Sequence, residues 1–477
     1  MAEMFIGGKE VVFDGLDRLE IRDPARQELV GDVPAGGADQ VDAGVRSAKE
    51  AFATWRRVPA ARRGELLLAA AQAVEAATDE LAPLLTAEQG KPLREARLEL
   101  AKFVHTLDHY AGLARNLRGQ SVPDLDVGTR GFVLKRPLGV VGAIVPWNFP
   151  TTLLGNKLAP ALICGNTVVA KPDETTPLTT LRVAQIMHEA GIPDGVFNVV
   201  TGTGVSAGAA LASHPDVAKV AFTGSTPVGK LVMATAAERM ARVTLELGGS
   251  DPMLILADGD VDKAISAASM GRFFNCGQAC LAIKRVYAEA SVYDHVVSRL
   301  AEKAGKLVLG HGDAKGTQLG PLHSAEGRDA IARQLADGVD SGGEIVAGGG
   351  IPEGDAFVDG FFHEPTVVAN PGHDSALGAE ETFGPLLPVW PVADLDEAIE
   401  RANASVFGLG SSVWTTDLRK ATHAMEALDA GYTWINSPTK VYDELPFGGL
   451  KESGYGKEHG IEVLSYYQEE KSVVIRD

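Results

Sequence analysis

The sequence predicts an α/β protein in which a parallel sheet is followed by a second α/β region. Short apolar, β-rich runs between residues 138 and 247 alternate with helical stretches, which is typical of parallel βαβ units. A second α/β pattern begins near residue 250. The chain has 477 residues, whereas one hydrophobic core usually serves about 250–300 residues. We therefore expect two large domains.

Composition and charge exclude several classes of protein. Hydrophobic residues make up 45% of the chain and charged residues 22%, as in ordinary globular proteins. The formal net charge of −19 repels phosphate backbones and anionic lipids, so nucleic-acid or membrane-surface binding is not expected. Three cysteines are too few for a disulfide framework, and residues 1–10 lack the features of a signal peptide. We expect a cytoplasmic protein without a membrane span.

The segment from residue 39 to residue 116 is predicted to be a helical scaffold. Apolar residues recur at steps of four and three from Val41 to Trp55, with Asp39 as the expected N-cap of a helix over 39–57. Further helical patterns cover 61–78 and 91–116 and carry no chemical motif.

Five β-rich runs follow, and we expect them to form the parallel sheet. A helix over 177–190, ended by Gly191, separates two of them. The carboxyl ends of parallel strands form the crevice in which such sheets bind ligands. The runs are 138–147, 166–171, 196–200, 219–224 and 243–247.

The second region has its own alternation of helices and strands. The tail from residue 466 to residue 477 indicates an edge strand, which must be paired or covered, for example by a second subunit. The glycine-rich patch at 342–350 is expected to be a surface turn. The other expected elements are helices near 261–274 and 292–308, a strand over 284–289 and strands after 360.

The segment FTGSTPVGK at 222–230 follows an apolar strand and opens a helix. Ser225 or Thr226 is the expected N-cap with Pro227 in the first turn, so backbone N–H groups and the helix dipole face one point that could bind phosphate. Gly224 and Gly229 do not form the usual dinucleotide fingerprint, so a capped helix with a purely structural role is the alternative.

A cation and a carboxylate stand at the end of another β-rich run. Lys171 and Glu174 would project from the carboxyl edge of the same sheet, where they could bind a ribose. A solvated turn with an ion pair is the alternative.

The segment FFNCGQAC at 273–280 places two cysteines in a break between a helix and a strand. A metal site is not expected, because two thiols four residues apart need two more ligands and no His or Cys cluster accompanies them. Cys164 is expected to be buried as a small hydrophobic residue. A cysteine in a glycine-containing loop is more accessible, although its reactivity requires a lowered pKa.

Glu246 and Asn148 are polar residues in apolar or rigid segments. Glu246 precedes a Gly-Gly turn, where burial would raise its pKa and suit it to general-base chemistry, unless its side chain faces solvent. The prolines and aromatic residues of VPWNFP could hold the Asn148 amide as a donor toward a developing alkoxide. EETFGP at 380–385 is a similar cluster, and a proline-defined turn is the alternative for both.

Together these motifs resemble the aldehyde dehydrogenase superfamily over nearly the whole chain, and they occur in the family's order. The matching segments are PWNFP (146–150), KPDE (171–174), FTGSTPVG (222–229), ELGGSDP (246–252), NCGQAC (275–280), EETFGP (380–385) and PFGGLKESGYGKEHG (446–460).

The resemblance implies a hydrolytic, non-acylating mechanism. Cys280 matches the nucleophile, which attacks the aldehyde as a thiolate, and Cys276 is a bystander. Asn148 and the backbone N–H of Cys280 match the oxyanion hole of the thiohemiacetal, from which hydride passes to the nicotinamide and leaves a thioester. Glu246 matches the base that activates the hydrolytic water, and Glu458 matches a proton-relay residue.

The resemblance also implies the cofactor contacts. Lys171 and Glu174 match the adenosine-ribose contacts, and Glu381 matches the nicotinamide-ribose contact. Because the Glu174 carboxylate, with Asp173 beside it, would repel a 2′-phosphate, NAD is favoured over NADP. The other cofactor-binding candidates are Gly224 and Ser225 at the pyrophosphate site, Phe383 beside the nicotinamide, and Gly229 and Trp147.

Members of the family have a three-part subunit and usually form dimers or tetramers. The resemblance implies a Rossmann-type NAD-binding domain at 1–118 and 138–246 and a catalytic domain at 247–464. A small β arm at 119–137 and 465–477 would join the subunits. The implied partners are an aldehyde and further copies of this chain.

The sequence leaves the aldehyde open. Asn156 stands where many members have Trp and where some that take succinic semialdehyde have Arg, and Leu281 replaces Thr, Cys or Ile. The tunnel candidates, which indicate a mostly apolar aldehyde, are Phe149, Leu153, Asn156, Leu281, Tyr442 and Phe447. A succinate-semialdehyde-type or amino-aldehyde dehydrogenase is the alternative.

Two further readings differ in chemistry. Acylating relatives, which use coenzyme A, generally lack the carboxylate found here at Glu246. Non-catalytic descendants that bind a dinucleotide or serve structurally usually lose a catalytic residue, whereas Cys280, Asn148 and Glu246 are all present.

Overall fold

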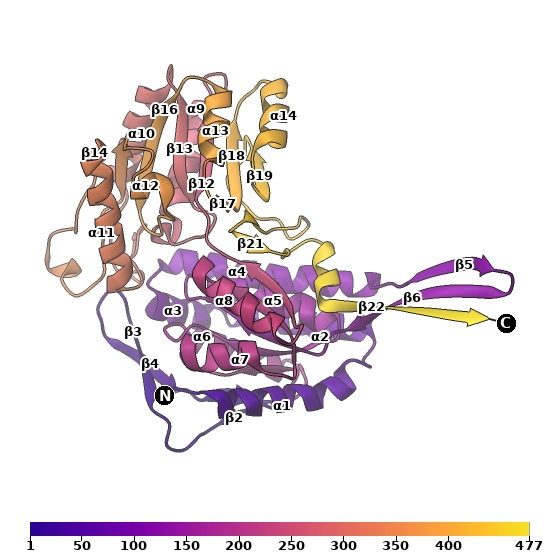
Figure 1. Cartoon of the computed structure of the whole chain (residues 1–477). Coiled ribbons are helices and arrows are strands. Elements are labelled where there is room, and N and C mark those ends of the chain that lie inside the picture. The colour runs from indigo at the N-terminus through magenta and orange to yellow at the C-terminus, as the bar shows by residue number, and fades with distance from the viewer. Residues whose placement is uncertain (477) are drawn as a thin grey trace.

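The computed structural model describes residues 1–476, in which two layered α/β bodies lie one above the other and a β arm projects to one side (Figure 1). The first body contains a sheet with the strand order β2-β1-β9-β8-β7-β10-β11-β21. Its five central strands are all parallel, which confirms the predicted βαβ units. These strands are β7 (Val140–Ile144), β8 (Thr167–Lys171), β9 (Phe197–Val199), β10 (Val217–Thr223) and β11 (Arg242–Glu246).

Antiparallel strands extend this sheet at both edges. β1 (Met4–Ile6) and β2 (Lys9–Val11) lie at one edge, and the short strand β21 (Gly454–Tyr455) pairs with β11 at the other. The pairing of Glu246 with Gly454 brings the C-terminal motif beside the end of β11. This return of the chain was not predicted.

Helices cover both faces of the first sheet because alternate strand residues point to opposite sides. Val141 and Val168 pack in a core with the helices of one face, and Val140 and Val169 pack in a second core with α1 on the other. The helices are α1 (Ala38–Trp55), α2 (Ala60–Ala76), α3 (Thr78–Gln89), α4 (Leu93–Leu113), α5 (Pro150–Ile163), α6 (Leu178–Glu189), α7 (Ala209–Ser213) and α8 (Thr226–Ala237).

Two predictions for the N-terminal helices are corrected. The N-cap of α1 is Gly37, so Asp39 lies in the first turn, where its charge still suits the helix dipole. Helix α3 was missed, and Pro83 lies inside it. Proline removes one backbone donor and weakens the helical signature, but burial of Leu81 and Leu85 stabilises the helix.

The second body is built on a sheet with the order β14-β15-β16-β13-β12-β18-β19, in which β14 alone is antiparallel to its neighbour. The strands are β12 (Asp251–Ile255), β13 (Ile283–Glu289), β14 (Glu344–Ala347), β15 (Thr366–Ala369), β16 (Leu386–Val392), β18 (Gly410–Trp414) and β19 (Tyr432–Ile435). The main helices are α9 (Val261–Phe273), α10 (Tyr293–Gly305), α11 (Ala325–Asp340), α13 (Leu395–Asn403) and α14 (Leu418–Ala427). β14 corrects the expectation of a simple turn at 342–350.

The arm contains β5 (Gln120–Asp126), β6 (Thr129–Pro137) and β22 (Gln468–Arg476) in the order β22-β6-β5. β22 pairs with β6 along its whole length and lies at the edge of this sheet, as predicted (Figure 1). Smaller elements are the hairpin of β3 (Arg18–Arg22) and β4 (Leu29–Pro34) and the pair β17 (Phe407–Gly408) and β20 (Leu450–Lys451). Within residues 1–476, no helix is long and apolar enough to cross a membrane.

Candidate active site

The loop between α9 and β13 carries Cys280. Asn275, Cys276 and Gly277 have φ values of 50°, 55° and 73°, a left-handed run that turns the chain sharply after the helix. Cys276 is buried by this turn, whereas Cys280 is partly exposed. The expected loop is therefore present, and Cys164 is buried as expected.

Buried hydrogen bonds fix Asn148 against this loop. The Asn148 side-chain amide donates to the Gln278 carbonyl across 3.1 Å, and the Asn275 amide donates to the Asn148 carbonyl across 3.0 Å. Glu95 of α4 accepts the Asn275 backbone N–H at 2.8 Å. One amide hydrogen of Asn148 remains for another acceptor.

A buried ion pair supports the backbone of Asn148 from the scaffold helices. The Lys91 ammonium donates to the Asn148 carbonyl at 2.8 Å and to Glu99, and it lies 4.1 Å from the centre of the Phe149 ring. Glu99 also accepts the backbone N–H of Thr151 at 2.9 Å. Both Lys91 and Glu99 are fully buried, so α4 belongs to the site as well as to the scaffold.

Glu246 ends β11 and is 5% exposed, so the solvent-facing alternative is wrong. Neither of its carboxyl oxygens has a hydrogen-bond partner among the described residues. Burial, with a smaller effect of Glu458, raises the pKa of Glu246 well above its usual range, against the opposing effects of Lys157 and Lys457. A Cβ atom at Gly448 would lie 2.5 Å from a Glu246 oxygen, so a glycine there leaves room for this carboxyl group.

Glu458 lies in the same buried region. It accepts hydrogen bonds from Lys157 at 2.6 Å and from the Asn156 amide at 3.0 Å. The backbone groups of Glu458 and Phe447 exchange two hydrogen bonds of 2.7 Å, which hold this part of the C-terminal motif. The Glu458 carboxyl group contributes to the raised pKa of Glu246.

The surroundings of the Cys280 thiol disfavour its thiolate form, because they raise its pKa. Burial raises its pKa to about 12, Lys284 opposes this shift, and the carboxyl groups of Asp251, Glu381 and Glu246 add to it. The lowered pKa that reactivity requires is thus absent here, and a nearby base must take the proton when sulfur attacks. Lys284 donates to the carbonyl groups of both Cys280 and Gly249, so the turn that follows Glu246 lies against the nucleophile loop.

Helix α8 begins at the carboxyl edge of the first sheet. Ser225 is its N-cap, as predicted, and the Ser225 side chain makes no capping hydrogen bond within residues 1–476. A Cβ at Gly229 would lie 2.4 Å from Leu247, and one at Gly224 would lie 2.4 Å from Phe222. Both glycines therefore permit close packing at the start of the helix.

Carboxylates stand at two other points of this edge. Lys171 and Glu174 form an ion pair of 2.8 Å. Burial alone would raise the pKa of Glu174, but Lys171 and backbone N–H groups lower it below its usual range. Glu381 accepts hydrogen bonds from the Gly249 N–H at 3.0 Å and from Lys284 at 2.5 Å.

A pocket of about 390 Å³ lies beside the nucleophile loop, with Gln278, Glu381 and Phe383 in its wall. Trp147, also in the wall, stacks on His323 at 4.5 Å and meets Phe383 edge-on at 5.6 Å. Trp147, which precedes Asn148, and Glu381 thus line the same cavity.

Three tunnel candidates contact the catalytic candidates or their loop. Phe149 stacks on Phe274 of the Cys280 loop at 6.0 Å, and Asn156 and Phe447 bond to Glu458. The other three lie elsewhere: Leu153 packs against the first core, Leu281 follows Cys280 in the chain, and Tyr442 is exposed beside Lys440.

Comparison with known proteins decides the family, because the model of the aldehyde dehydrogenase family matches residues 13–473. The chain belongs to the aldehyde dehydrogenase family. It is 42% identical to phenylacetaldehyde dehydrogenase of Pseudomonas fluorescens over 99% of this chain and 95% of that protein. It is 41% identical to human aldehyde dehydrogenase 1A1 over 96% of this chain and 92% of that one.

Solved aldehyde dehydrogenase structures have the same fold. The Bacillus cereus enzyme, solved as an NAD⁺ complex, superimposes with a TM-score of 0.96, 38% identity and coverage of 100% of this chain and 96% of that chain. The Brucella melitensis enzyme gives a TM-score of 0.97, 32% identity and coverage of 100% and 97%. The family resemblance and the fold class inferred from sequence are confirmed.

In this aldehyde dehydrogenase, sequence reasoning missed several buried cations of the site. Lys157 lies within the otherwise apolar α5, so an isolated charge in an apolar segment was the available signal, and Lys284 stands beside Arg285 in a buried strand. Lys91, Glu95 and Glu99 recur at steps of four, with both glutamates on α4 and Lys91 two residues before it, which was a second signal.

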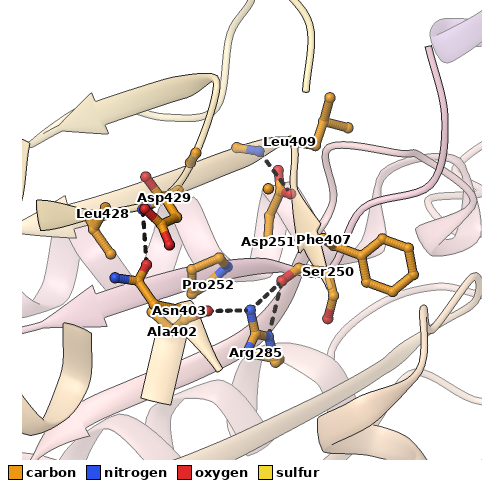
Figure 2. A pocket seen from close by; sticks show the side chains of 14 residues that line it. Ser250, Asp251, Pro252, Arg285, Ala402, Asn403, Phe407, Leu409, Leu428 and Asp429 are labelled. Carbon is orange, nitrogen blue, oxygen red and sulfur yellow. Dashed lines mark hydrogen bonds between the residues drawn. The ribbon is translucent and has the colours of Figure 1, made fainter. Parts of the chain in front are cut away.

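The polar pocket in Figure 2 lies behind the Gly-Gly turn and contains neither Cys280 nor Glu246. Arg285 donates to the carbonyls of Ser250 and Ala402 in its wall, and Asp251 accepts the Gly410 N–H at 3.0 Å (Figure 2). Its residues anchor the start of β12, which follows the turn after Glu246.

Proposed function

We propose that the chain oxidises an aldehyde to a carboxylic acid with NAD⁺ through a thioester on Cys280. The observation that carries the proposal is that Asn148, which lies far from Cys280 in sequence, is hydrogen-bonded to the Cys280 loop, and that Lys284 joins Cys280 to the turn that follows the buried Glu246. A donor, a nucleophile and a carboxyl group are the parts that acyl chemistry at a thiol requires.

The residues at the carboxyl edge fit a dinucleotide. The uncapped N–H groups of α8 and the unused Ser225 hydroxyl suit a pyrophosphate, and the Glu174 and Glu381 carboxylates suit two riboses. The negative charge of Glu174 favours NAD over NADP, and the Bacillus cereus relative solved with NAD⁺ supports this choice. The cofactor supplies a hydride acceptor, and Trp147, Gly224, Gly229 and Phe383 complete the proposed contacts.

In the first half-reaction, the Cys280 sulfur bonds to the aldehyde carbon and the thiol proton passes to water. Glu246, whose carboxyl oxygens have no hydrogen-bond partner within residues 1–476, stays available as the base of the second half-reaction. The free amide hydrogen of Asn148 and the Cys280 backbone N–H stabilise the developing alkoxide. Loss of hydride from the same carbon leaves a thioester on Cys280.

In the second half-reaction, water attacks the thioester and Glu246 takes its proton. The bond between carbon and sulfur breaks, and Cys280 is released with the carboxylic acid. Glu458 and Lys157, which are joined by a hydrogen bond of 2.6 Å, offer a buried route by which that proton can leave Glu246. A water-activating carboxyl group favours hydrolysis over transfer to coenzyme A.

We propose a mostly apolar aldehyde as the substrate, bordered by Phe149, Leu153, Asn156, Leu281, Tyr442 and Phe447. Asn156 has a neutral amide, which is already hydrogen-bonded to Glu458. It therefore offers no positive charge to a substrate carboxylate. The relative named phenylacetaldehyde dehydrogenase supports an apolar, aromatic substrate class. A succinate-semialdehyde or amino-aldehyde preference is the alternative outcome of the screen below.

We also propose the assembly and the domain roles. The NAD-binding domain is 1–118 with 138–246, the catalytic domain is 247–464, and the arm is 119–137 with 465–477. The projecting sheet of β5, β6 and β22 offers free strand edges, which supports pairing with a second subunit in a cytoplasmic homodimer or homotetramer.

The test is turnover by purified protein and its Cys280→Ser variant, with aromatic, aliphatic, amino and semialdehyde substrates and both cofactors. Without coenzyme A, the wild type should form equal amounts of NADH and acid. Cys280→Ser should form no NADH yet bind NAD⁺ as the wild type does, and Cys276→Ser, its matched control, should stay active. Unchanged turnover by Cys280→Ser, or an absolute requirement for coenzyme A, would overturn the proposal.

A further inference from the structure

Lys284 joins three separate parts of the proposed site. It lies near the start of β13, and its side chain is 1% exposed. Its ammonium donates to the Gly249 carbonyl at 2.6 Å, to the Cys280 carbonyl at 3.0 Å and to the Glu381 carboxylate at 2.5 Å. An ammonium has three donors, so all of them are used.

The three acceptors come from different segments of the chain. Gly249 belongs to the turn after Glu246, Cys280 is the proposed nucleophile, and Glu381 is the proposed ribose ligand. The Gly249 N–H donates in turn to Glu381 at 3.0 Å, so turn, lysine and carboxylate form a closed ring. The Phe383 ring centre lies 5.5 Å from the same ammonium.

The next residue on β13 holds the same turn. The pairing of β12 with β13 shifts register at Lys284, and Arg285 enters the pocket of Figure 2, where it donates to Ser250. Lys284 and Arg285 thus bond to two successive carbonyl groups, those of Gly249 and Ser250. The start of β13 fixes the backbone between Glu246 and β12.

Lys284 also differs in charge from the other groups that act on the thiol. Among the described residues, those groups are the ammonium of Lys284 and the carboxyl groups of Asp251, Glu381 and Glu246. Removal of Lys284 would leave Glu381 beside the Cys280 carbonyl without its counter-charge, and would leave acidic groups alone around the sulfur.

We propose that Lys284 is a positioning residue that holds the Cys280 backbone and the Glu381 carboxylate on one ammonium, and so sets the nucleophile relative to the nicotinamide ribose. This inference rests on the proposed function. Lys284 makes no contact with the reacting atoms in this role, and it acts through Cys280 and Glu381.

The experiment compares Lys284→Met with a control, Lys420→Met. Lys420 lies on the outer helix α14, and its ammonium forms an ion pair with Asp258. Two measurements need no turnover: the rate of iodoacetamide alkylation of Cys280 against pH, assigned by peptide mass spectrometry, and the Kd for NAD⁺. Loss of one nearby cation typically shifts a pKa by about one unit or more. Lys284→Met should therefore slow alkylation at pH 9 about tenfold and weaken NAD⁺ binding several-fold, while Lys420→Met should match the wild type.

Lys284→Arg should recover much of both losses, because it keeps the charge. If Lys284→Met does not fold, Lys284→Gln, which keeps a neutral donor, decides the question by the same measurements. A lower melting temperature with an unchanged alkylation profile and an unchanged Kd would show a merely structural role and overturn the proposal. Failure of the proposed function appears separately, as NADH formation by Cys280→Ser.

Discussion

The side-chain amide of Asn148 donates a hydrogen bond of 3.1 Å to the backbone carbonyl of Gln278, two residues before Cys280. This bond orients the amide, and Lys91 holds the Asn148 backbone by donating a hydrogen bond to its carbonyl group. Because the amide is held in one orientation, its second hydrogen needs no rearrangement to reach the developing alkoxide. A donor that is oriented in advance in this way is most effective at an oxyanion.

Asn148→Ala should lower kcat/KM for the aldehyde about 100- to 1000-fold, because the loss of one oxyanion donor costs about 2.7–4 kcal/mol. The matched control is Asn166→Ala, which removes a buried amide that is hydrogen-bonded to Gly139 and Tyr467. Asn166 lies just before the first residue of β8. That variant should melt at a lower temperature with kcat/KM nearly unchanged. Steady-state kinetics check both, and equal losses in the two variants would refute an oxyanion role.

Glu246→Gln should stop the reaction after about one turnover, because hydride transfer precedes the step that needs a base for water. Rapid mixing should show a burst of NADH, and intact-protein mass spectrometry should show an acyl adduct on Cys280. Glu75→Gln, on the exposed side of α2, is the control and should turn over normally. A variant without adduct and without loss of rate would mean that another group activates the water.

Glu174→Gln should raise the ratio of kcat/KM for NADP⁺ to that for NAD⁺ about tenfold. The carboxylate opposes a 2′-phosphate, and its removal frees Lys171, now bonded to it at 2.8 Å, to attract the phosphate instead. Glu189→Gln removes an exposed carboxylate from the nearby α6 and should leave the ratio unchanged. No change in the Glu174 variant would show that cofactor choice is made elsewhere.

Asp251→Asn should reduce the loss of stability as pH rises from about 4 to about 8. Burial raises the pKa of Asp251 from 3.8 to about 7, although Lys284, Arg285 and the Gly410 N–H oppose the shift. A carboxyl group with a raised folded pKa contributes stability that is fully present below its unfolded pKa and is lost as pH rises through the folded pKa. The contribution at stake is at most about 4 kcal/mol.

Melting temperatures of the wild type and Asp251→Asn, measured across this pH range, test the effect. The variant should gain on the wild type as pH rises, and exposed Asp262→Asn should run parallel to the wild type. A constant difference between wild type and Asp251→Asn would show that Asp251 titrates normally.

The parts of the fold that were predicted correctly are those in which local pattern and tertiary packing agree. The five runs of the first sheet are apolar because parallel strands are buried on both faces, so each run indicates its strand directly. Helix α3 and strand β14 were missed because Pro83 and the flanking glycines obscure their periodicity. Contacts with the rest of the fold stabilise both segments in spite of those residues.

The buried lysines that support the site could not be predicted from local sequence patterns. Asn148, Glu246 and Cys280 stand in recognisable motifs, whereas the supporting lysines do not. Lys157 lies within helix α5, Lys284 within strand β13, and Lys91 in the connection before α4. A lysine within an apolar segment becomes informative only when its partner is known. The partners of Lys157 and Lys284 are Glu458 and Glu381, which lie about 300 and 100 residues away.

The sequence by itself determined the family, the five parallel strands of the first sheet, and the residue types available for chemistry, because all three are encoded in local motifs and periodicity. Only the tertiary structure decided the protonation and the mutual placement of these groups. Burial and long-range ion pairs set them: the pKa of the Cys280 thiol is raised, the Glu246 carboxyl group has no hydrogen-bond partner within residues 1–476, and Lys284 links both sides of the site. Electrostatic energies depend on distance and solvent exclusion, which are properties of the folded chain.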